Sequence, residues 1–230
     1  MNEPISKVLM SRRQVLLTAA AAAATQFVLP ANIKADSNPA VGGVIEKMDI
    51  DHFVEDCIAA NRDSEPQAAV RDVLAKAVHN HKAVLASIGE PYKAGINVLH
   101  RSATLTIFAA TWTPQMNLMP HNHLMWANIG IYTGREDNIM WRRTVDGIEA
   151  FEAKALFKGD AASLPTDAIH SVTNPLLRFT GGIHIYGGDF FDTTRSQWNS
   201  ETLDEEPSDG AVIRGIFERE NERMGINEAT

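Results

Sequence analysis

The chain has 230 residues, of which 44% are hydrophobic, and a formal net charge of −8 at pH 7. This length and apolar content suffice for one sizeable domain with peripheral segments. The sequence shows no cluster of basic residues of the kind that nucleic-acid binding requires, so no nucleic-acid partner is expected. The single cysteine, Cys57, excludes an intrachain disulfide, and its apolar helical context predicts a buried residue rather than a nucleophile.

Residues 1–35 have the pattern of an export signal. The segment SRRQVLLTAAAAAATQFVLP joins a basic start to an alanine-rich apolar run that is too short for a membrane span, so no stable span is expected in the mature chain. The pair Arg12-Arg13 resembles a twin-arginine signal, although an ordinary secretory signal or an uncleaved anchor stays open. The resemblance implies the twin-arginine machinery as a partner and a periplasmic location, or a cytoplasmic one if the signal does not function. Cleavage is expected after Ala31 or Ala35.

Residues 36–94 are predicted to form a linker followed by a helical region. The spacing of apolar residues predicts one helix over 50–63 and a longer amphipathic helix over 64–89, with Ser64 as its N-cap and Gly89 as its stop. The apolar stripe of the longer helix comprises Val70, Val73, Leu74, Ala77, Val78, Val84 and Leu85.

From about residue 95 to residue 195 the chain consists of short segments rich in β-branched and aromatic residues. These segments are GINVLHR, ATLTIFAATW, LMWANIGIYTG, DNIMWRRTV, GIEAFEAKALFKG, ASLPTDAIHSVTN and LRFTGGIHIYGGDFF. Turn residues separate them at Gly134-Arg135-Glu136-Asp137, Asp146-Gly147, Gly159-Asp160, Asn174-Pro175 and Gly187-Gly188. Many short strands at this spacing predict a β-barrel or jelly roll. Residues 196–230 are predicted to be an acidic tail with a short helix at 213–224.

Three of the eight histidines form a pattern that predicts a metal site. His121 and His123 are two residues apart at the expected start of a strand, which places both side chains on one face. His170 follows 47 residues after His123, at the start of another strand. Three imidazoles converging in a barrel would form a neutral site suited to iron, copper, nickel or zinc, with open positions for a substrate.

The other histidines favour structural or exposed positions. His79 and His81 repeat the same spacing, but on a helix their side chains diverge by about 200°, which makes a poor chelate. His52 and His100 have no partner at ligand spacing. Chance also remains an explanation for the pattern around His121, because two histidines at this spacing occur on many surfaces.

Two stretches resemble the motifs of the cupin family. PHNHLMWANIGIYTGRE resembles the first motif, and GDAASLP followed by AIHSVTN resembles the second. The resemblance implies a mainly β fold, the double-stranded β-helix or jelly-roll barrel, with N-terminal helices and a short C-terminal helix added. It also implies that His121, His123 and His170 are the metal ligands. Most cupins add a glutamate a few residues after the second histidine, whereas residues 124–128 contain no carboxylate.

The closer resemblance is to the cysteine dioxygenase branch, the iron-dependent thiol dioxygenases, which also lack this glutamate. GIHIYGG places His184 and Tyr186 where that branch has a catalytic pair. The resemblance implies Fe²⁺, or another divalent transition metal, and oxidation of a small thiol by O₂ to a sulfinate. Two positions depart from the branch: Gly182 replaces a serine, and Ala127 or Asn128 replaces a cysteine that forms a crosslink in the animal enzymes.

Substrate recognition and the alternatives stay open on sequence grounds. Arg101 is the candidate for binding a substrate carboxylate, with Arg142 or Arg143 as rivals, but it also suits a solvated strand edge. His184 and Tyr186 could instead be a polar pair that fills the barrel. Another cupin metalloenzyme, such as an isomerase or lyase, and a non-catalytic metal-binding or small-molecule-binding cupin are the alternatives. The oligomeric state is not predicted.

Overall fold

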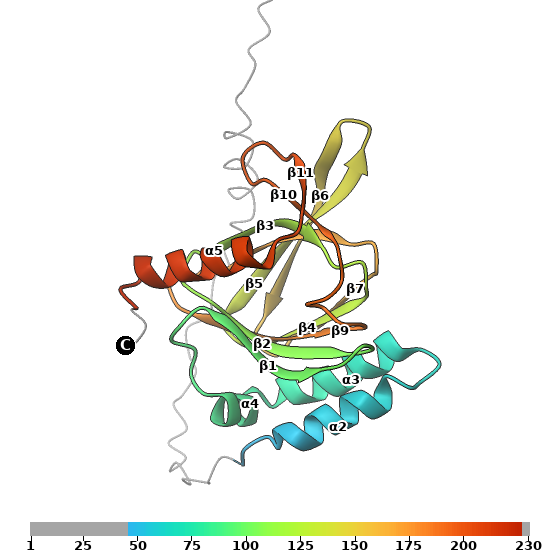
Figure 1. Ribbon diagram of the computed structural model, residues 1–230. Coiled ribbons are helices and arrows are strands. Elements are labelled where there is room, and N and C mark those ends of the chain that lie inside the picture. Colours follow the sequence, from blue (N-terminus) through green and yellow to red (C-terminus); the bar gives the residue numbers. More distant parts are fainter. Residues whose placement is uncertain (1–45, 227–230) are drawn as a thin grey trace, which may run out of the picture. The chain divides into compact units, whose positions relative to one another are not determined.

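Two antiparallel sheets face each other in residues 46–226, the part of the chain that the computed structural model describes (Figure 1). One sheet has the order β1-β2-β9-β4-β7, and the other has the order β11-β10-β3-β8-β5-β6. The strands are β1 (Gly95–Arg101), β2 (Thr106–Trp112), β3 (Asn117–Asn122), β4 (Ala127–Thr133), β5 (Arg135–Thr144), β6 (Gly147–Phe157), β7 (Ala161–Leu164), β8 (Ile169–Thr173), β9 (Thr180–Tyr186), β10 (Ser196–Trp198) and β11 (Glu205–Pro207). The predicted export signal and its cleavage sites lie outside the described residues.

This strand order confirms the predicted mainly β fold, a double-stranded β-helix with helices at both ends of the chain. Neighbours in each sheet are distant in sequence, as in a jelly roll: β9 lies between β2 and β4, and β8 lies between β3 and β5. β10 and β11 come after residue 195, the predicted end of the barrel, and lengthen the six-stranded sheet.

Three helices cover the outer face of the five-stranded sheet (Figure 1). They are α2 (Ile50–Ala60), α3 (Pro66–His79) and α4 (His81–Ile88). The prediction of one continuous helix over 64–89 was wrong, because the chain leaves helical geometry at Asn80, where φ is −88° and ψ is 52°. Ser64 is not the N-cap either, since Glu65 occupies that position. Gly89 ends α4 as predicted, with a φ of 97° that favours glycine.

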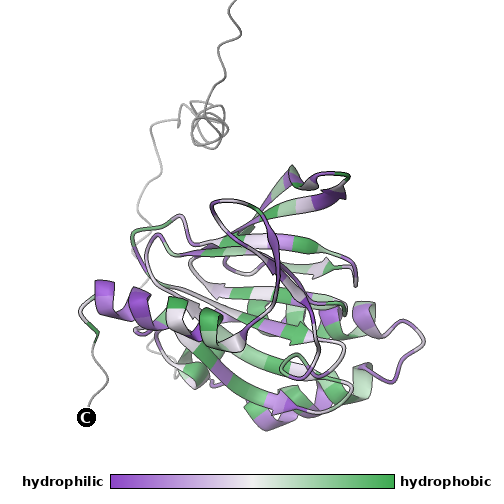
Figure 2. Cartoon of the chain, turned by 45° about the horizontal axis from the view of Figure 1, so that its top comes forward, coloured by the Kyte–Doolittle hydropathy of each residue, from purple (hydrophilic) through white to green (hydrophobic). Residues whose placement is uncertain are grey.

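The alternation of side chains along the strands divides the interior into two cores. On β9, Ile183 and Ile185 face the helices, whereas His184 and Tyr186 face the space between the sheets. Figure 2 shows the same alternation as hydrophobic and hydrophilic bands along the strands. The polar residues of a candidate site are therefore carried inward by the same pattern that attaches the helices.

The helix-facing core joins α2 and α3 to the sheet. Leu74 is fully buried, and a Cβ added at Gly130 on β4 would lie only 2.8 Å from its Cγ, so the helix packs directly on the strand backbone. Trp126 also packs on this side. Cys57 is fully buried here, and burial, followed by the charge of Asp56, raises the pKa of its thiol to about 12, which fits the prediction of a structural cysteine.

The turn between β4 and β5 differs from its prediction. A four-residue turn was expected at Gly134-Arg135-Glu136-Asp137, but Gly134 makes the turn alone with a φ of 81°. A side chain there would also collide with Thr180. Because the turn is this short, Glu136 lies on β5 and faces the barrel interior, where it is fully buried.

The C-terminal helix α5 (Gly210–Arg223) confirms the helix predicted at 213–224. The side-chain amide of Asn221 donates to the carbonyl of Ala94 and accepts from its N–H, at 2.9 and 2.7 Å. Phe217 stacks on Trp112 with 5.5 Å between ring centroids. These contacts hold the helix against the barrel. No helix within residues 46–226 is long and apolar enough to cross a membrane.

Candidate metal centre

His121 and His123 lie at the end of a strand, not at the start of one. β3 ends at Asn122, His123 follows it, and the apolar run that was expected to continue this strand forms β4 in the opposite sheet. The prediction was wrong on this point because residues 123–126 form a bend between the two sheets, with Leu124 at a φ of 55°. Both imidazoles nevertheless point into the barrel, as expected.

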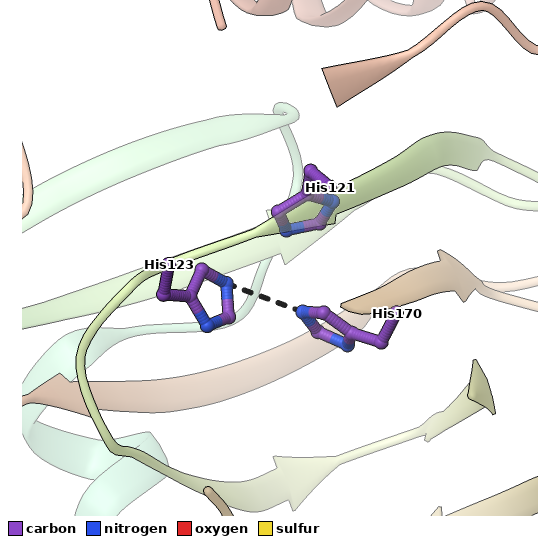
Figure 3. A group of neighbouring side chains, drawn as sticks. All are labelled: His121, His123 and His170. Carbon is purple, nitrogen blue, oxygen red and sulfur yellow. Dashed lines mark hydrogen bonds between the residues drawn. The ribbon is translucent and has the colours of Figure 1, made fainter. Parts of the chain in front are cut away.

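The three predicted histidines converge in the structure (Figure 3). His121 on β3 is paired directly with His170 on β8, as antiparallel neighbours. One ring nitrogen from each of His121, His123 and His170 lies within 4.8 Å of the other two, and the residues are 7%, 1% and 1% exposed. The local fold therefore places three imidazole nitrogens around one small volume between the sheets.

Hydrogen bonds to two of the rings determine which nitrogen faces this volume. Nδ1 of His121 lies 2.9 Å from the carbonyl of Met119, and Nδ1 of His170 lies 2.6 Å from Oδ1 of Asn138. A backbone carbonyl can only accept, so Nδ1 of His121 carries the proton and Nε2 keeps its lone pair. Such fixed tautomers are typical of metal-binding histidines.

The orientation of Asn138 follows from its other neighbour, Glu136. The amide Nδ2 of Asn138 donates to Oε1 of Glu136 over 3.1 Å, since an ionised carboxylate only accepts. Its carbonyl oxygen must then face His170 and accept the Nδ1 proton, which leaves a lone pair on Nε2 of His170. The buried carboxylate thus fixes, through one amide, the ligand nitrogen of a histidine on the neighbouring strand.

A close nitrogen pair shows that the site suits a cation. Nε2 of His123 lies 3.2 Å from Nε2 of His170 (Figure 3). Two lone pairs at this distance repel unless a proton or a metal ion lies between them. Burial, together with the charge of the neighbouring imidazoles, lowers the pKa of both rings well below the usual value, which favours the neutral form that binds metals. The donor set fits a divalent transition metal.

Removal of the Asn138 amide is expected to weaken metal binding without removing a ligand. Asn138→Ala frees Nδ1 of His170 and leaves its tautomer unspecified, so we expect metal affinity to fall about 10- to 100-fold, as for other partners of ligand histidines. Titration of the metal-free protein with Zn²⁺ against a competing chelator measures this. Asn117→Ala, on the exposed part of β3, is the control. Equal affinities in wild type and Asn138→Ala would contradict the role of the amide.

The metal-free protein is expected to lose stability as the pH falls. Burial lowers the pKa of His121 to about 4, whereas an unfolded histidine titrates near 6.5. The unfolded state therefore binds the proton first, so stability is complete above pH 6.5 and declines toward pH 4, by about 3 kcal/mol for His121 alone. Urea unfolding at pH 7.5 and 4.5 measures the loss, and His121→Asn should show a smaller one. An equal loss in both proteins would refute this account.

The opposite wall of the site comes from the five-stranded sheet. Tyr186 on β9 packs edge-on against His123 with 4.9 Å between ring centroids, and its hydroxyl lies 3.4 Å from Nδ1 of His184. The rings of Phe108 and Phe190 pack beside the Tyr186 ring, with 5.2 and 4.3 Å between ring centroids. The structure therefore brings the predicted pair, His184 and Tyr186, to the three histidines inside an aromatic wall. Burial raises the pKa of Tyr186, so its hydroxyl stays protonated.

The structure adds an arginine to the site that sequence reasoning missed. Arg195 precedes β10, whose Gln197 is paired with His121. Its Nη1 donates to the carbonyls of Phe190 and Thr193, and its Cζ lies 4.0 Å from the centroid of the Phe190 ring. Among the described residues its buried Nε has no hydrogen-bond partner, and no carboxylate forms an ion pair with it. Its charge contributes to the lowered pKa of His121 and to that of His123, after the larger effect of burial.

The predicted arginine, Arg101, occupies a different environment. It ends the edge strand β1, is 48% exposed, and forms an ion pair with Asp189 at 2.9 Å while lying over the Phe191 ring. Its two rivals are also engaged elsewhere: Arg142 pairs with Glu149 and Arg143 with Glu205. None of the three has a contact with the histidine cluster in the described structure, which leaves Arg195 as the half-buried arginine near the cluster that has no carboxylate partner.

Comparisons with known proteins find similar solved structures but no matching family or curated protein. No family model matches the chain, and no curated protein matches it. Among solved structures, an RmlC-like cupin family protein with a double-stranded β-helix fold from Methanocaldococcus jannaschii has 10% identity over 43% of this chain and 84% of its own, with a TM-score of 0.37. A Klebsiella pneumoniae protein with a double-stranded β-helix domain has 9% identity over 51% of this chain and 85% of its own, with a TM-score of 0.35.

A third similar structure is described as a sugar phosphate isomerase from a cupin superfamily, from Silicibacter pomeroyi. It has 12% identity over 47% of this chain and 64% of its own, with a TM-score of 0.34. These three similar structures are described as cupin or double-stranded β-helix proteins. The fold of this chain is defined by its own strand order, and its chemistry by its own residues.

Proposed function

We propose that the chain is an iron-dependent, thiol dioxygenase-like enzyme, which adds both atoms of O₂ to the sulfur of a small thiol and forms a sulfinate. The observation that supports this most directly is the ligand set, three neutral imidazole nitrogens within 4.8 Å of one another and no carboxylate among them. Atoms and electrons balance without a further reductant, since the thiol and O₂ together make the sulfinic acid.

The neutral ligand set favours a thiolate substrate. Three imidazoles leave the full charge of a divalent ion uncompensated, so an anionic sulfur is a better additional ligand than a neutral group. His121, His123 and His170 would hold a ferrous ion, which would supply open coordination positions and electron-transfer chemistry for the reaction of O₂ with sulfur. The aromatic residues Phe108 and Phe190 keep bulk water from the reacting atoms.

Arg195 supports a thiol that carries a carboxylate. Its guanidinium is fixed by two backbone carbonyls and by the Phe190 ring, yet its Nε has no partner. A buried donor without a partner is costly, and a substrate carboxylate would satisfy Nε of this half-buried arginine through a charge-assisted hydrogen bond. Tyr186, whose ring packs against both His123 and Phe190, would hydrogen-bond the bound substrate.

The cellular setting follows from the amino-terminal pattern around Arg12-Arg13. We propose export of the folded protein through the twin-arginine machinery to the periplasm, with a cytoplasmic location if the signal does not function. Export after folding would allow a metal to be acquired in the cytoplasm. Fractionation of cells that express the wild type and an Arg12→Lys, Arg13→Lys variant tests this independently of activity.

The proposed activity is tested by metal analysis of the purified protein combined with measurement of O₂ consumption. We expect about one equivalent of iron, uptake that depends on a thiol, and a sulfinate product by mass spectrometry. The thiols are 3-mercaptopropionate, cysteine and cysteamine, because only the first two carry a carboxylate for Arg195. Bound metal without thiol-dependent uptake would refute the dioxygenase.

A cupin isomerase or lyase is the second candidate. It is favoured by the buried Glu136 carboxylate 3.2 Å from His184, since an acid–base pair beside a metal site suits proton transfer next to a carbonyl. The same purified protein distinguishes the candidates: a metal other than iron, with no uptake of O₂ with any thiol, would favour this reading. If a Tyr186→Phe variant binds its ligand as the wild type does and neither protein shows activity, a non-catalytic binding protein would be favoured.

A further inference from the structure

We propose that Glu136 is a positioning residue that sets the tautomer of His184 and, through it, the direction of the Tyr186 hydroxyl. Glu136 and His184 lie on different sheets, so the contact crosses the barrel interior. The inference concerns the same site as the proposed function and deepens it, but its first test does not depend on dioxygenase activity.

Glu136 is a fully buried carboxylate, and each of its two oxygens accepts a hydrogen bond from an uncharged donor. Oε2 accepts the indole N–H of Trp112 at 2.9 Å, and Oε1 accepts from Asn138 at 3.1 Å. No arginine or lysine forms an ion pair with it in the described structure. An unpaired buried carboxylate costs several kcal/mol, so these donors and the imidazole of His184 are what keep it ionised. Burial alone raises its pKa, but these groups together lower it below the usual value.

The remaining neighbour of this carboxylate is Nε2 of His184. The nitrogen is buried and lies 3.2 Å from Oε2 of Glu136, at an angle that falls short of a well-aligned hydrogen bond. No other acceptor among the described residues bonds to it. Because the carboxylate only accepts, the favoured state of His184 has its proton on Nε2.

Gly182 keeps this nitrogen available to Glu136. It lies two residues before His184 on β9 and faces the same way. A Cβ added at Gly182 would lie 3.3 Å from Nε2 of His184 and 3.1 Å from Cδ1 of Ile131. A side chain at this position would therefore crowd the imidazole and compete for the same nitrogen. Because position 182 has no side chain, Nε2 of His184 contacts the carboxylate of Glu136, which is distant in the sequence.

The tautomer determines what the tyrosine offers to the pocket. With the proton on Nε2, Nδ1 of His184 has a lone pair that accepts from the Tyr186 hydroxyl, 3.4 Å away. The tyrosine oxygen then presents its lone pairs to a substrate and can accept a hydrogen bond from a thiol. If the proton moved to Nδ1, that group would donate to the tyrosine oxygen, and the hydroxyl hydrogen would turn toward the pocket instead.

Nitrogen-15 NMR of the histidine side chains tests the tautomer directly. The full-length protein is loaded with Zn²⁺, which is diamagnetic, and the signals of His184 are assigned with a His184→Gln variant. We expect a protonated Nε2 and an unprotonated Nδ1 in the wild type. In Glu136→Gln the indole N–H of Trp112 keeps the amide oxygen at the Oε2 position, so Nε2 of His184 faces a neutral acceptor in place of a carboxylate, and the population of the Nδ1-protonated tautomer should rise. A wild-type proton on Nδ1, or identical wild-type and Glu136→Gln spectra, would overturn the proposal, and the wild-type result stands even if the variant does not fold.

A kinetic cycle tests the link to Tyr186 once a thiol substrate is found. Glu136→Gln is expected to lower kcat about 10-fold with little change in KM, as for other residues that orient a catalytic group. In a Tyr186→Phe background the same substitution should have no further effect on kcat. Glu205→Gln, which removes a surface ion pair with Arg143, is the control. Independent, multiplicative losses in the double variant would refute the link, whereas absence of any thiol activity would refute only the proposed function.

Discussion

Replacement of His170 with alanine is expected to abolish metal binding by the purified protein. His170 is opposite His121 in the strand pairing, and its Nε2 lies 3.2 Å from that of His123, so it is the ligand that joins β8 to β3. Mutation of a residue that only hydrogen-bonds a ligand typically lowers metal affinity about 10- to 100-fold. Loss of one of the three ligands should therefore lower it at least about 10²-fold. Metal analysis after purification and Zn²⁺ titration by calorimetry measure this loss.

The matched control for this experiment is His81→Ala. His81 begins α4 on the helical side of the five-stranded sheet and belongs to the other pair of histidines two residues apart. We expect it to retain wild-type metal content, because its neighbour His79 lies on a different helix and is exposed. Full metal occupancy in His170→Ala, with a normal melting temperature, would refute the three-histidine site.

The histidine cluster could be predicted because its signal is local. His121 and His123 differ by two positions, and this spacing places both side chains on one side of an extended chain even where the strand stops at Asn122. His170 was identified from its own strand start. The prediction survived an error about where the strand begins, since the convergence depends on extended backbone at these positions and not on their belonging to one strand.

Glu136 and Asn138 could not be recognised from the sequence as part of the site. GRED suggests an exposed turn, because glycine followed by charged residues is typical of surface loops. In the structure Gly134 turns the chain alone, and the alternation along β5 then sends residues 136 and 138 inward. Partners on other strands, Trp112 and His184, make the buried carboxylate acceptable, and such long-range partners leave no local pattern.

The arginine near the histidine cluster could not be identified from the sequence for a related reason. Arg101 was favoured by its place upstream of His121, but the ion pair with Asp189 depends on residues 88 positions apart in the chain. Arg195 has no motif around it; only the folded chain places it over Phe190 and beside β3. Charge compensation therefore separates the two arginines: one has a carboxylate, and the other has backbone carbonyls and a free donor.

Replacement of Arg195 with glutamine is expected to reduce the catalytic efficiency kcat/KM with a carboxylate thiol by about 10²-fold, chiefly through a higher KM. Loss of one partner from a buried charged hydrogen bond costs about 2–5 kcal/mol. Efficiency with cysteamine, which lacks a carboxylate, should change little, so the preference between the two thiols collapses. Oxygen consumption with both substrates measures the ratio of the two kcat/KM values. Arg195→Lys should restore the preference for the carboxylate thiol only in part, because lysine lacks the planar guanidinium that binds a carboxylate with two N–H groups.

Arg101→Gln is the matched control, since it removes the same charge from a half-exposed position that Asp189 already neutralises. Surface ion pairs contribute about 0–1 kcal/mol, so the variant should keep both its stability and its preference for the carboxylate thiol. The opposite pattern, a large loss of efficiency in Arg101→Gln with a normal Arg195→Gln enzyme, would return the substrate carboxylate to Arg101. Equal, modest effects on both thiols in Arg195→Gln would instead mean that its charge acts on the neutral state of His121 and His123 and does not bind the substrate.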